Sequence, residues 1–303
     1  MVKDSVKQRR SLKKWALDIF GKNAEQRVFN IINYVLFTLF TLIMLAPFIY
    51  VLVVSFQQKA IVNDVSVNVF GIGAYKHVLG NPNILRAFLN TIGTVLIGTA
   101  FAVCMTMLGA YPLSKKHMRG RGFLLVYVLI TMLFSGGLIP FYLLIKNLGL
   151  GDSYLVYIVI GALGAFNIFI VKNFYQGIPV ELEEAAKIDG ANEFQVFFRV
   201  YLPLSKSIMA TIALWISVGK WNDYMTGLLY IDSPQKLLIQ NVLRDMLVTA
   251  STTSGTGADA GMLNLSESIK MATVVIAMVP IMCVYPFVQK YFTKGVIRGS
   301  VKG

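Results

Sequence analysis

Three features of the 303-residue sequence predict an all-α integral membrane protein with six transmembrane helices. First, 56% of the residues are hydrophobic and only 14% are charged, whereas soluble domains carry about 25% charged residues. Second, six apolar stretches are long enough to cross a bilayer core of about 30 Å as helices. Third, the basic residues cluster in the connections on one side of these stretches. The composition excludes an ordinary soluble domain, and the many aromatic residues exclude a disordered chain.

The six predicted spans form one domain over residues 29–292. Each is a window of about 20 residues that is nearly free of charge, with ends placed to within about three residues. They cover residues 29–54, 88–111, 123–145, 154–171, 208–231 and 269–292. The first is longer than the apolar core of a signal peptide, about 7–15 residues, and no small-residue cleavage site follows it. We therefore expect it to remain as a membrane anchor.

The distribution of Lys and Arg predicts that both termini are cytoplasmic, because basic residues accumulate on the cytoplasmic side of spanning segments. Of the 28 basic residues, 20 lie in segments that share one side of the membrane. These segments are the N-terminal arm 1–28, the connection 115–121, the coupling loop 172–206 and the chain from Lys290, which includes the C-terminal tail 293–303. The external loops are then residues 55–87, 146–153 and 232–268.

The cysteine and histidine residues do not predict a catalytic or metal site. Cys104 and Cys283 lie in apolar runs, so neither a disulfide framework nor a metal site is predicted. His77 and His117 have no acidic cluster beside them and indicate surface positions. The net charge of +13 is explained by the one-sided distribution of basic residues, so we expect contact with membrane lipid and no nucleic acid. The stretch Thr249–Gly261 fits either a flexible linker or a contact with substrate or partner.

The loop between the fourth and fifth spans predicts two short helices. Pro179 suits the first turn of a helix whose early Glu residues complement its dipole, and Gly190 suits the left-handed residue that ends it. Asn192 and Gln195 have the spacing of a capping box for a second helix, which Pro203 ends. This second helix presents three aromatic residues, Phe194, Phe197 and Phe198. An exposed apolar patch requires either a protein partner or lipid headgroups, and both alternatives remain open.

The spacing in this loop resembles the signature loop of ATP-binding-cassette importer permeases. Glu184-Ala185-Ala186, then Gly190, Val200 and Leu202-Pro203 follow the family pattern, with Val200 where the consensus has Ile. The chain end from Lys294 looks like the tail of maltose-type sugar permeases. The whole chain most resembles the LplC/YtcP-type branch of carbohydrate importers, which are multi-pass proteins of the bacterial cell membrane.

This resemblance implies that the loop docks in a groove of an ATPase subunit. It assigns coupling roles to Glu184, Ala185, Ala186, Asp189, Gly190, Phe194, Phe198, Leu202 and Pro203. The implied partners are a second permease subunit, two ATP-binding subunits that hold ATP and Mg²⁺, an extracytoplasmic solute-binding protein and an oligosaccharide. The sequence has no phosphate-binding loop pattern, since Gly21-Lys22 precedes Asn23 and Gly219-Lys220 precedes Trp221, where the pattern needs Ser or Thr. We therefore expect a non-enzymatic subunit without a cofactor.

The fifth span is interrupted by the polar run Lys220-Trp221-Asn222-Asp223-Tyr224. Each ionisable side chain at bilayer depth costs about 2.5–3.5 kcal/mol on insertion scales, so these groups need a watery cavity or each other. Amide groups beside aromatic rings suit a sugar, which favours a substrate path. Lys220 and Asp223 are three residues apart and equally suit an internal ion pair. Lys220 hints at an anionic sugar, although the resemblance implies that the sugar site of the maltose importer lies on the partner permease.

The sequence thus predicts one permease subunit of a heterodimer that imports an oligosaccharide by alternating access, driven by ATP in attached subunits. The alternatives are an intramembrane enzyme or a secondary transporter that handles a sugar or a lipid-linked sugar. An enzyme of that kind needs an acidic or His-bearing cluster at the membrane face. A secondary transporter usually has broken helices and buried carboxylates in both halves, whereas this sequence shows one interruption.

Overall fold

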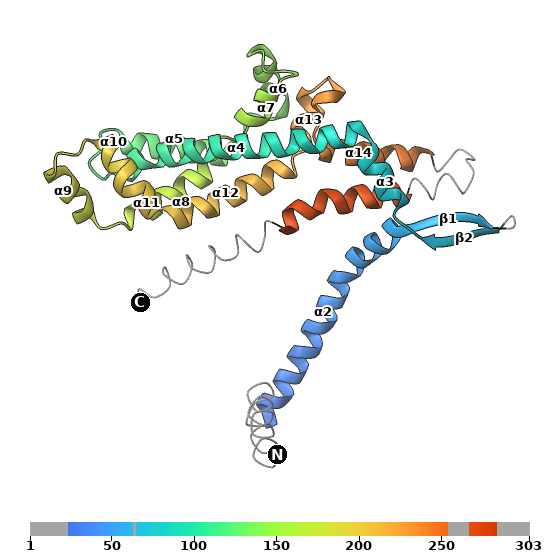
Figure 1. Cartoon of the computed structure of the whole chain (residues 1–303). Coiled ribbons are helices and arrows are strands. Elements are labelled where there is room, and N and C mark those ends of the chain that lie inside the picture. Colours follow the sequence, from blue (N-terminus) through green and yellow to red (C-terminus); the bar gives the residue numbers. More distant parts are fainter. Residues whose placement is uncertain (1–23, 63–64, 254–266, 284–303) are drawn as a thin grey trace.

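A computed structural model describes residues 24–62, 65–253 and 267–283 of the chain. The predicted C-terminal tail, most of the N-terminal arm and most of the stretch Thr249–Gly261 lie outside these residues. The body is a helical bundle arranged along one long helix, α4 (Pro82–Ser114). Packed against α4 are α12 (Lys206–Trp221), α8 (Ala165–Gln176) and α7 (Tyr154–Val159), as Figure 1 shows.

Local chemistry explains how α4 begins and why other helices approach it closely. The Asn81 side chain accepts a hydrogen bond from the amide of Asn83 at 3.0 Å, and Pro82 occupies the first turn. Its buried face is rich in small residues, including Gly98, Ala102 and Ala110. Small residues let helix backbones approach each other closely. Within a membrane this close packing holds helices together, because the hydrophobic effect does not drive their association in lipid.

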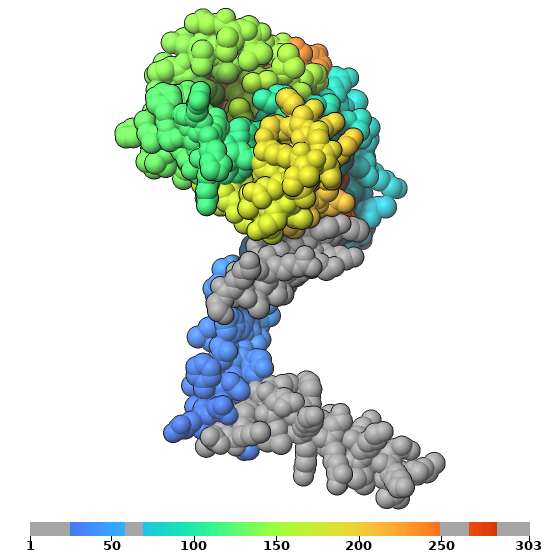
Figure 2. Space-filling view, turned by 90° about the vertical axis from the view of Figure 1, so that its left-hand side faces the viewer, coloured from blue at the N-terminus to red at the C-terminus, as the bar shows by residue number. Residues whose placement is uncertain are grey.

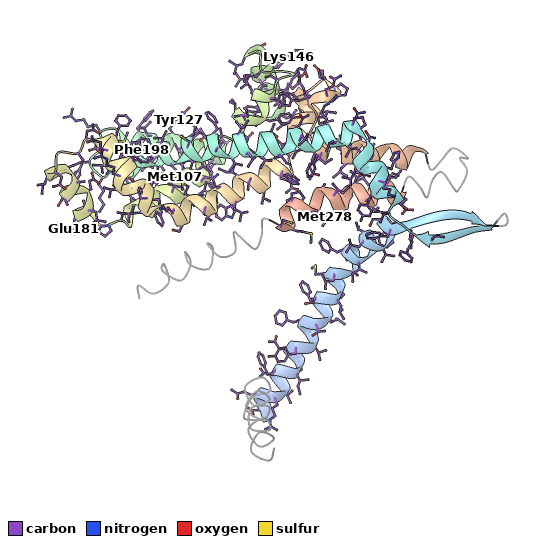
Figure 3. The ribbon with its side chains drawn as sticks, in the orientation of Figure 1. Met107, Tyr127, Lys146, Glu181, Phe198 and Met278 are labelled. Carbon is purple, nitrogen blue, oxygen red and sulfur yellow. The ribbon has the colours of Figure 1, made fainter. Side chains whose placement is uncertain are left out.

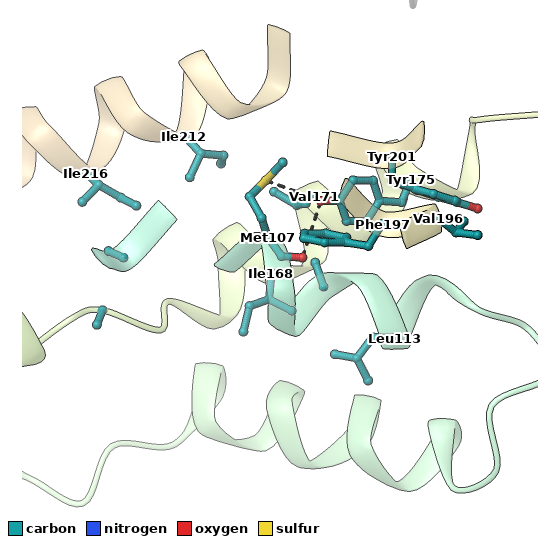
Figure 4. Close-up of a cluster of buried hydrophobic side chains, with 13 residues drawn as sticks. Met107, Leu113, Ile168, Val171, Tyr175, Val196, Phe197, Tyr201, Ile212 and Ile216 are labelled. Carbon is teal, nitrogen blue, oxygen red and sulfur yellow. Dashed lines mark hydrogen bonds between the residues drawn. The ribbon is translucent and has the colours of Figure 1, made fainter. Parts of the chain in front are cut away.

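The largest buried cluster lies at one end of the body, beneath the loop between α8 and α12. Figure 4 shows Met107 of α4 against Tyr175 of α8, with Phe197 and Tyr201 of the loop beside them. The Tyr175 hydroxyl donates to the Met107 carbonyl at 3.5 Å. The ring centroids of Tyr175 and Tyr201 are 5.4 Å apart in an edge-on contact. The loop therefore packs against the bundle and contributes to its buried core.

The first predicted span is the helix α2 (Ala24–Phe56), which extends away from the body in Figure 1. Its apolar side chains are exposed over almost its whole length, and burial begins at Val54 and Ser55. Within the described residues, α2 from Glu25 and α4 are the two helices long and apolar enough to cross a membrane. The count rises to four if each of two bent helix pairs is one span, so the prediction of six spans remains a prediction.

The predicted third and fourth spans are each broken into two short helices. The third consists of α5 (Arg121–Leu133) and α6 (Leu138–Asn147), which meet at 112°. Gly137 at this break has φ +88°, and Gly161 between α7 and α8 has φ +72°. Such angles favour glycine and interrupt a helix, so composition alone predicted continuous spans where the backbone turns.

The first predicted external loop contains a β-hairpin, a local exception in a described fold that is otherwise helical, as predicted. Strands β1 (Gln57–Val62) and β2 (Val65–Phe70) pair antiparallel, with Gln57 opposite Phe70 and Val62 opposite Val65. Valine at every second position, in Val65, Val67 and Val69, is the period of a strand and explains the hairpin. The short helix α3 (Gly73–Gly80) follows it.

Two connections predicted to lie on the external side contact each other beside α4, where α7 and α13 (Met225–Tyr230) project from the body in Figure 1. They are the turn before α7 and the turn after α13, which contains the 3₁₀ turn Pro234–Lys236. Asp152 forms an ion pair with Lys236 at 2.8 Å and accepts a hydrogen bond from the Ser233 hydroxyl at 2.7 Å. These hydrogen bonds lower the pKa of Asp152. The helices α14 (Ile239–Thr253) and 267–283 complete the described fold.

Candidate functional site

The first helix of the predicted coupling loop is α9 (Val180–Ile188), and its ends match the prediction. Pro179 is its N-cap residue, and Gly190 has φ +83° just beyond its C-terminus. The Gly190 amide donates to the Lys187 carbonyl at 3.0 Å, and the Ala191 amide donates to the Ala186 carbonyl at 2.9 Å. This pair of bonds is a Schellman motif, which provides donors to the last helical carbonyls. The motif forms only when the residue after the C-cap, here Gly190, has a left-handed backbone conformation. Gly190 is therefore required by the backbone.

The second helix begins with the predicted capping box. The Asn192 side chain accepts from the Gln195 amide, and the Gln195 side chain accepts from the Asn192 amide, both at 2.9 Å. The helix α10 (Glu193–Val196) then widens into a π-helical turn over Phe197–Tyr201 and ends in α11 (Leu202–Leu204). Pro203 has no N–H to donate to the carbonyl four residues earlier, which accounts for the wider turn before it.

The loop exposes a different set of apolar residues from the one that the sequence predicts. Phe194 and Phe198 are 73% and 54% exposed, as expected. Phe197 is buried, with its ring centroid 5.1 Å from that of Tyr111, so the prediction of three exposed aromatic rings is wrong for this residue. Ile188 is 86% exposed, which the sequence reasoning missed. The signal that could have found it is an apolar residue in the last turn of a short, otherwise polar helix, next to the expected stop at Gly190.

A buried carboxylate holds α9 to the bundle. Glu183 accepts hydrogen bonds from Lys115, which caps α4, from the Lys187 ammonium at 2.8 Å and from the Tyr201 hydroxyl at 2.7 Å. The Lys115 ammonium also lies 4.4 Å and 4.2 Å from the ring centroids of Tyr111 and Tyr201. This geometry combines cation–π attraction with charge-assisted hydrogen bonds. One side chain thus joins α9, α4 and the π-helical turn.

The hydrogen bonds keep this carboxylate ionised. Burial alone would raise the pKa of Glu183, but the bonds from Lys115, Lys187 and Tyr201 outweigh it and lower the pKa to about 2. Glu183 therefore stabilises the loop at neutral pH, and this contribution is lost as the pH falls from about 4.5 toward about 2. Lys187 also pairs with Glu193 at 2.8 Å, and its hydrogen bond lowers the pKa of Glu193.

The predicted coupling residues divide into an outward and an inward set. Glu184, Ala185, Asp189 and Gly190 are exposed at the end of the molecule that Figure 2 views, where the loop is coloured yellow. Figure 3 shows Glu181 and Phe198 at the same end. Leu202 instead packs against the buried cluster. The outward surface contains a pocket of about 290 Å³ between α9 and the second helix. The residues that line this pocket are Ala186, Asp189, Gly190, Ala191, Gln195, Arg199 and Val200.

The polar run in the fifth span does not form the internal ion pair between Lys220 and Asp223 that was one of the two sequence-based expectations. The Lys220 ammonium donates to the carbonyls of Tyr157 at 2.6 Å, Ile160 at 3.4 Å and Ile158 at 3.5 Å. These carbonyls belong to the C-terminal end of α7, where the fourth span is broken. Backbone groups freed by a break inside a membrane need partners, and a cation suits the negative end of a helix. Lys220 therefore caps a broken helix inside the bundle.

The other residues of this run also have defined partners. Lys220 and Asp223 do not come within ion-pair distance, and Asp223 accepts from the Thr226 amide at 3.0 Å at the start of α13. Trp221 is buried, and its indole N–H donates to the Ala277 carbonyl at 3.1 Å. Asn222 and Tyr224 are exposed on a pocket. Within the described residues, no group of three or more His, Cys, Asp and Glu side chains could hold a metal ion.

Comparison with known proteins identifies the family. Residues 20–298 match the family described as binding-protein-dependent transport system inner membrane component, and the chain belongs to it. The chain is 43% identical to protein LplC of Bacillus subtilis over 91% of this chain and 96% of that protein. It is 41% identical to the polygalacturonan/rhamnogalacturonan transport system permease protein YtcP of the same organism, over 92% of this chain and 100% of that protein.

Solved structures show the same fold. A chain of a bacterial ABC transporter involved in the import of the acidic polysaccharide alginate superposes with a TM-score of 0.79 at 32% identity, over 89% of this chain and 99% of that chain. The predicted function is thereby confirmed: the chain is a permease subunit of an ATP-driven sugar importer, and the ATPase activity belongs to partner subunits. The alternatives of an intramembrane enzyme and a secondary transporter lose their support.

Replacing Glu183 by Gln tests the anchor of the coupling loop. The amide keeps the size of the side chain but loses its charge, so the bonds from Lys115 and Lys187 weaken. We expect the free energy of unfolding to fall by about 1–3 kcal/mol, measured by thermal unfolding of the purified assembly in detergent. Glu181→Gln removes the same charge from an exposed position of α9 and should leave the melting temperature unchanged. Equal effects of the two variants would contradict the anchor.

Replacing Lys220 by Met tests the helix cap inside the bundle. Met retains the apolar stem but leaves three carbonyls at the break without their donor, which should lower the melting temperature of the assembly clearly. Lys146→Met, at the exposed tip of α6 in Figure 3, is the matched control and should have no such effect. Normal thermal stability of Lys220→Met together with lost sugar uptake would instead indicate a direct contact of Lys220 with the substrate.

Proposed function

We propose that this subunit couples ATP hydrolysis to the passage of an oligosaccharide, received from an extracytoplasmic solute-binding protein, into the cytoplasm. It works with a second permease subunit and two ATP-binding subunits that hold ATP and Mg²⁺. The observation that carries the proposal is the α9 loop, which presents an outward surface and is fixed to α4 through Glu183. The substrate class follows from the relatives, two of which are described with polysaccharides.

The outward surface of α9 suits a groove of an ATPase subunit. Ala185, Ala186 and Gly190 carry little or no side chain, so a partner backbone can approach closely. Exposed Ile188 supplies an apolar contact, and exposed Glu184 supplies a charge for a basic partner. The remaining coupling residues have two roles. Asp189, Phe194 and Phe198 border the contact with the ATPase subunit. Leu202 and Pro203 join the loop to the fifth span.

Movement of α9 reaches the membrane domain through α4. Closure of the ATPase subunits displaces α9, and Glu183 carries this displacement to Lys115 at the end of α4. α4 packs along α12, α8 and α7, so these helices follow as one body. Packed interfaces are bistable and not continuously deformable, which converts a local displacement into alternating access.

The substrate path passes the interruption of the fifth span. Asn222 and Tyr224 offer an amide and a phenol to a sugar, while Lys220, Trp221 and Asp223 hold the backbone around them in shape. Figure 1 shows α3 and the hairpin at the end of the body opposite α9, and this is the end that would face the solute-binding protein.

Gly190→Val tests the coupling role. The valine side chain disfavours φ +83°, so the Schellman motif cannot form and α9 loses its terminus. We expect uptake of sugar into proteoliposomes to fall at least tenfold, while binding of sugar to the solute-binding protein is unchanged. Gly122→Val adds the same side chain where nothing lies within 4 Å and should retain uptake. Uptake by Gly190→Val at the level of Gly122→Val would contradict the proposal.

The orientation is tested by labelling single cysteines with a membrane-impermeant maleimide. In a background with Cys104→Ser and Cys283→Ser, the exposed positions Lys146→Cys and Arg119→Cys probe opposite sides of the membrane. We expect intact cells to label position 146 only, and permeabilised cells to label both, because the loop with Arg119 is cytoplasmic. Labelling of position 119 in intact cells would reverse the orientation and place both termini outside.

A further inference from the structure

A pocket of about 570 Å³ lies between the interruption of the fifth span, α14 and the helix 267–283. We propose that this pocket binds a sugar residue that carries a carboxylate, and that Arg244 recognises the acid group. This inference rests on the proposed function and deepens it by naming the chemical class of the substrate. A volume of this size is typical of small-molecule sites, about 300–1,000 Å³.

The pocket combines a few polar groups with an apolar wall, which is the usual composition of such sites. The polar groups are Asn222 and Tyr224 from the interruption, and Gln240 and Arg244 from α14. The apolar wall consists of Leu243, Leu247, Val248, Val274, Ala277, Met278 and Ile281. Gln240 and Arg244 are four residues apart, so they project from the same face of the helix. Met278 is labelled in Figure 3 on the helix 267–283.

Among the described residues that line the pocket, Arg244 is the one with an ionised side chain. Its guanidinium carbon lies 5.9 Å from the ring centroid of Tyr224, a contact that holds the cation without an oxygen acceptor. The carboxylate of Asp245 is 3.8 Å from the nearest guanidinium nitrogen, which is beyond hydrogen-bond length. A guanidinium presents five donors in a plane and matches a carboxylate with two parallel hydrogen bonds. Within the described residues, the charge of Arg244 is therefore paired with Asp245 at a distance too long for a hydrogen bond, and Asp245 does not line the pocket.

A hydrogen bond between α14 and the fifth span fixes the shape of the pocket. The Asn241 side chain donates to the Tyr224 carbonyl at 2.7 Å, which seats α14 on the interruption of the fifth span. Gly227 makes this approach possible, because a Cβ atom there would lie 2.3 Å from the Asn241 side-chain oxygen. Asn222 donates to the Val218 carbonyl at 2.9 Å, so its side-chain oxygen remains to accept from a sugar hydroxyl.

The other cation near this region does not compete for the acid group. The donors of Lys220 are directed at the carbonyls of α7, and Lys220 does not line the pocket. Asp223, the nearest acid in the run, is engaged by the Thr226 amide and does not line it either. The charge that selects the substrate is thus Arg244, and not the lysine that the sequence suggests.

The test uses the complete importer in proteoliposomes with its solute-binding protein, and compares uptake of trigalacturonate with uptake of neutral maltotriose. We expect wild-type protein to take up trigalacturonate, and Arg244→Gln to reduce this uptake at least tenfold. The melting temperature should be unchanged, since the Arg244 side chain is 40% exposed.

Arg86→Gln is the matched control, because it removes the same charge from an exposed position on α4 outside the pocket. Arg244→Lys keeps the charge without the planar donor pair and should give uptake between that of wild type and Arg244→Gln. Equal uptake by Arg244→Gln and Arg86→Gln would overturn the inference and leave the proposed function intact. Wild-type uptake of maltotriose alone would also overturn it. Uptake of neither sugar by the wild type would overturn the proposed function, and the inference with it.

Discussion

The buried carboxylate of Glu183 is the interaction on which the position of α9, the proposed coupling helix of this permease, depends. α9 is a nine-residue helix, too short to be stable alone in water. Its outward face is exposed, so its position is fixed almost entirely by what its inward face contacts. Glu183 meets Lys115, Lys187 and Tyr201 in one place. Removing any partner would leave a buried charge without full compensation, which is costly, so the arrangement is held as a unit.

In the middle of the bundle, a partly buried positive charge is likewise held by several hydrogen-bond partners. Lys220 lies among the carbonyls of a broken helix, and a membrane interior cannot supply water to satisfy them. Gly98 of α4 leaves room for the stem of this lysine, because a Cβ atom there would lie 2.9 Å from its Cδ and Cε atoms. α4 therefore contacts a charged anchor at its end, Lys115, and another along its length. In the proposed mechanism, these two contacts let one helix connect the ATPase side to the substrate side.

The sequence predicted best what depends on neighbouring residues. The left-handed Gly190 and the capping box of Asn192 follow from local backbone chemistry, and both are present. The membrane class followed from composition. The partners of Glu183 and Lys220 could not be predicted, since Lys115 is 68 residues from Glu183, and Tyr157 is 63 residues from Lys220. Burial of Phe197 has the same cause, because its neighbour Tyr111 belongs to another helix.

The breaks in the predicted spans show a second limit of sequence reasoning. An apolar window of about 20 residues is equally compatible with one straight helix and with two short ones. Glycines at positive φ decide between them, and their angles depend on the packing around them. The residue that we propose for recognition of the acid group, Arg244, was missed for a related reason. Lys220 attracts attention as an ionisable residue in an apolar run, while Arg244 lies on an amphipathic helix where a charge is ordinary.

The measurement that tests the central claim most directly is a double-mutant cycle between Glu183 and Lys115. Uptake of sugar by the reconstituted importer is compared for Glu183→Gln, Lys115→Met, the pair together and the wild type. If the two side chains act as one anchor, the double variant loses little more than either single variant, with an interaction free energy of about 1 kcal/mol or more. Losses that simply add would contradict the account, because the loop would then transmit its movement by another route.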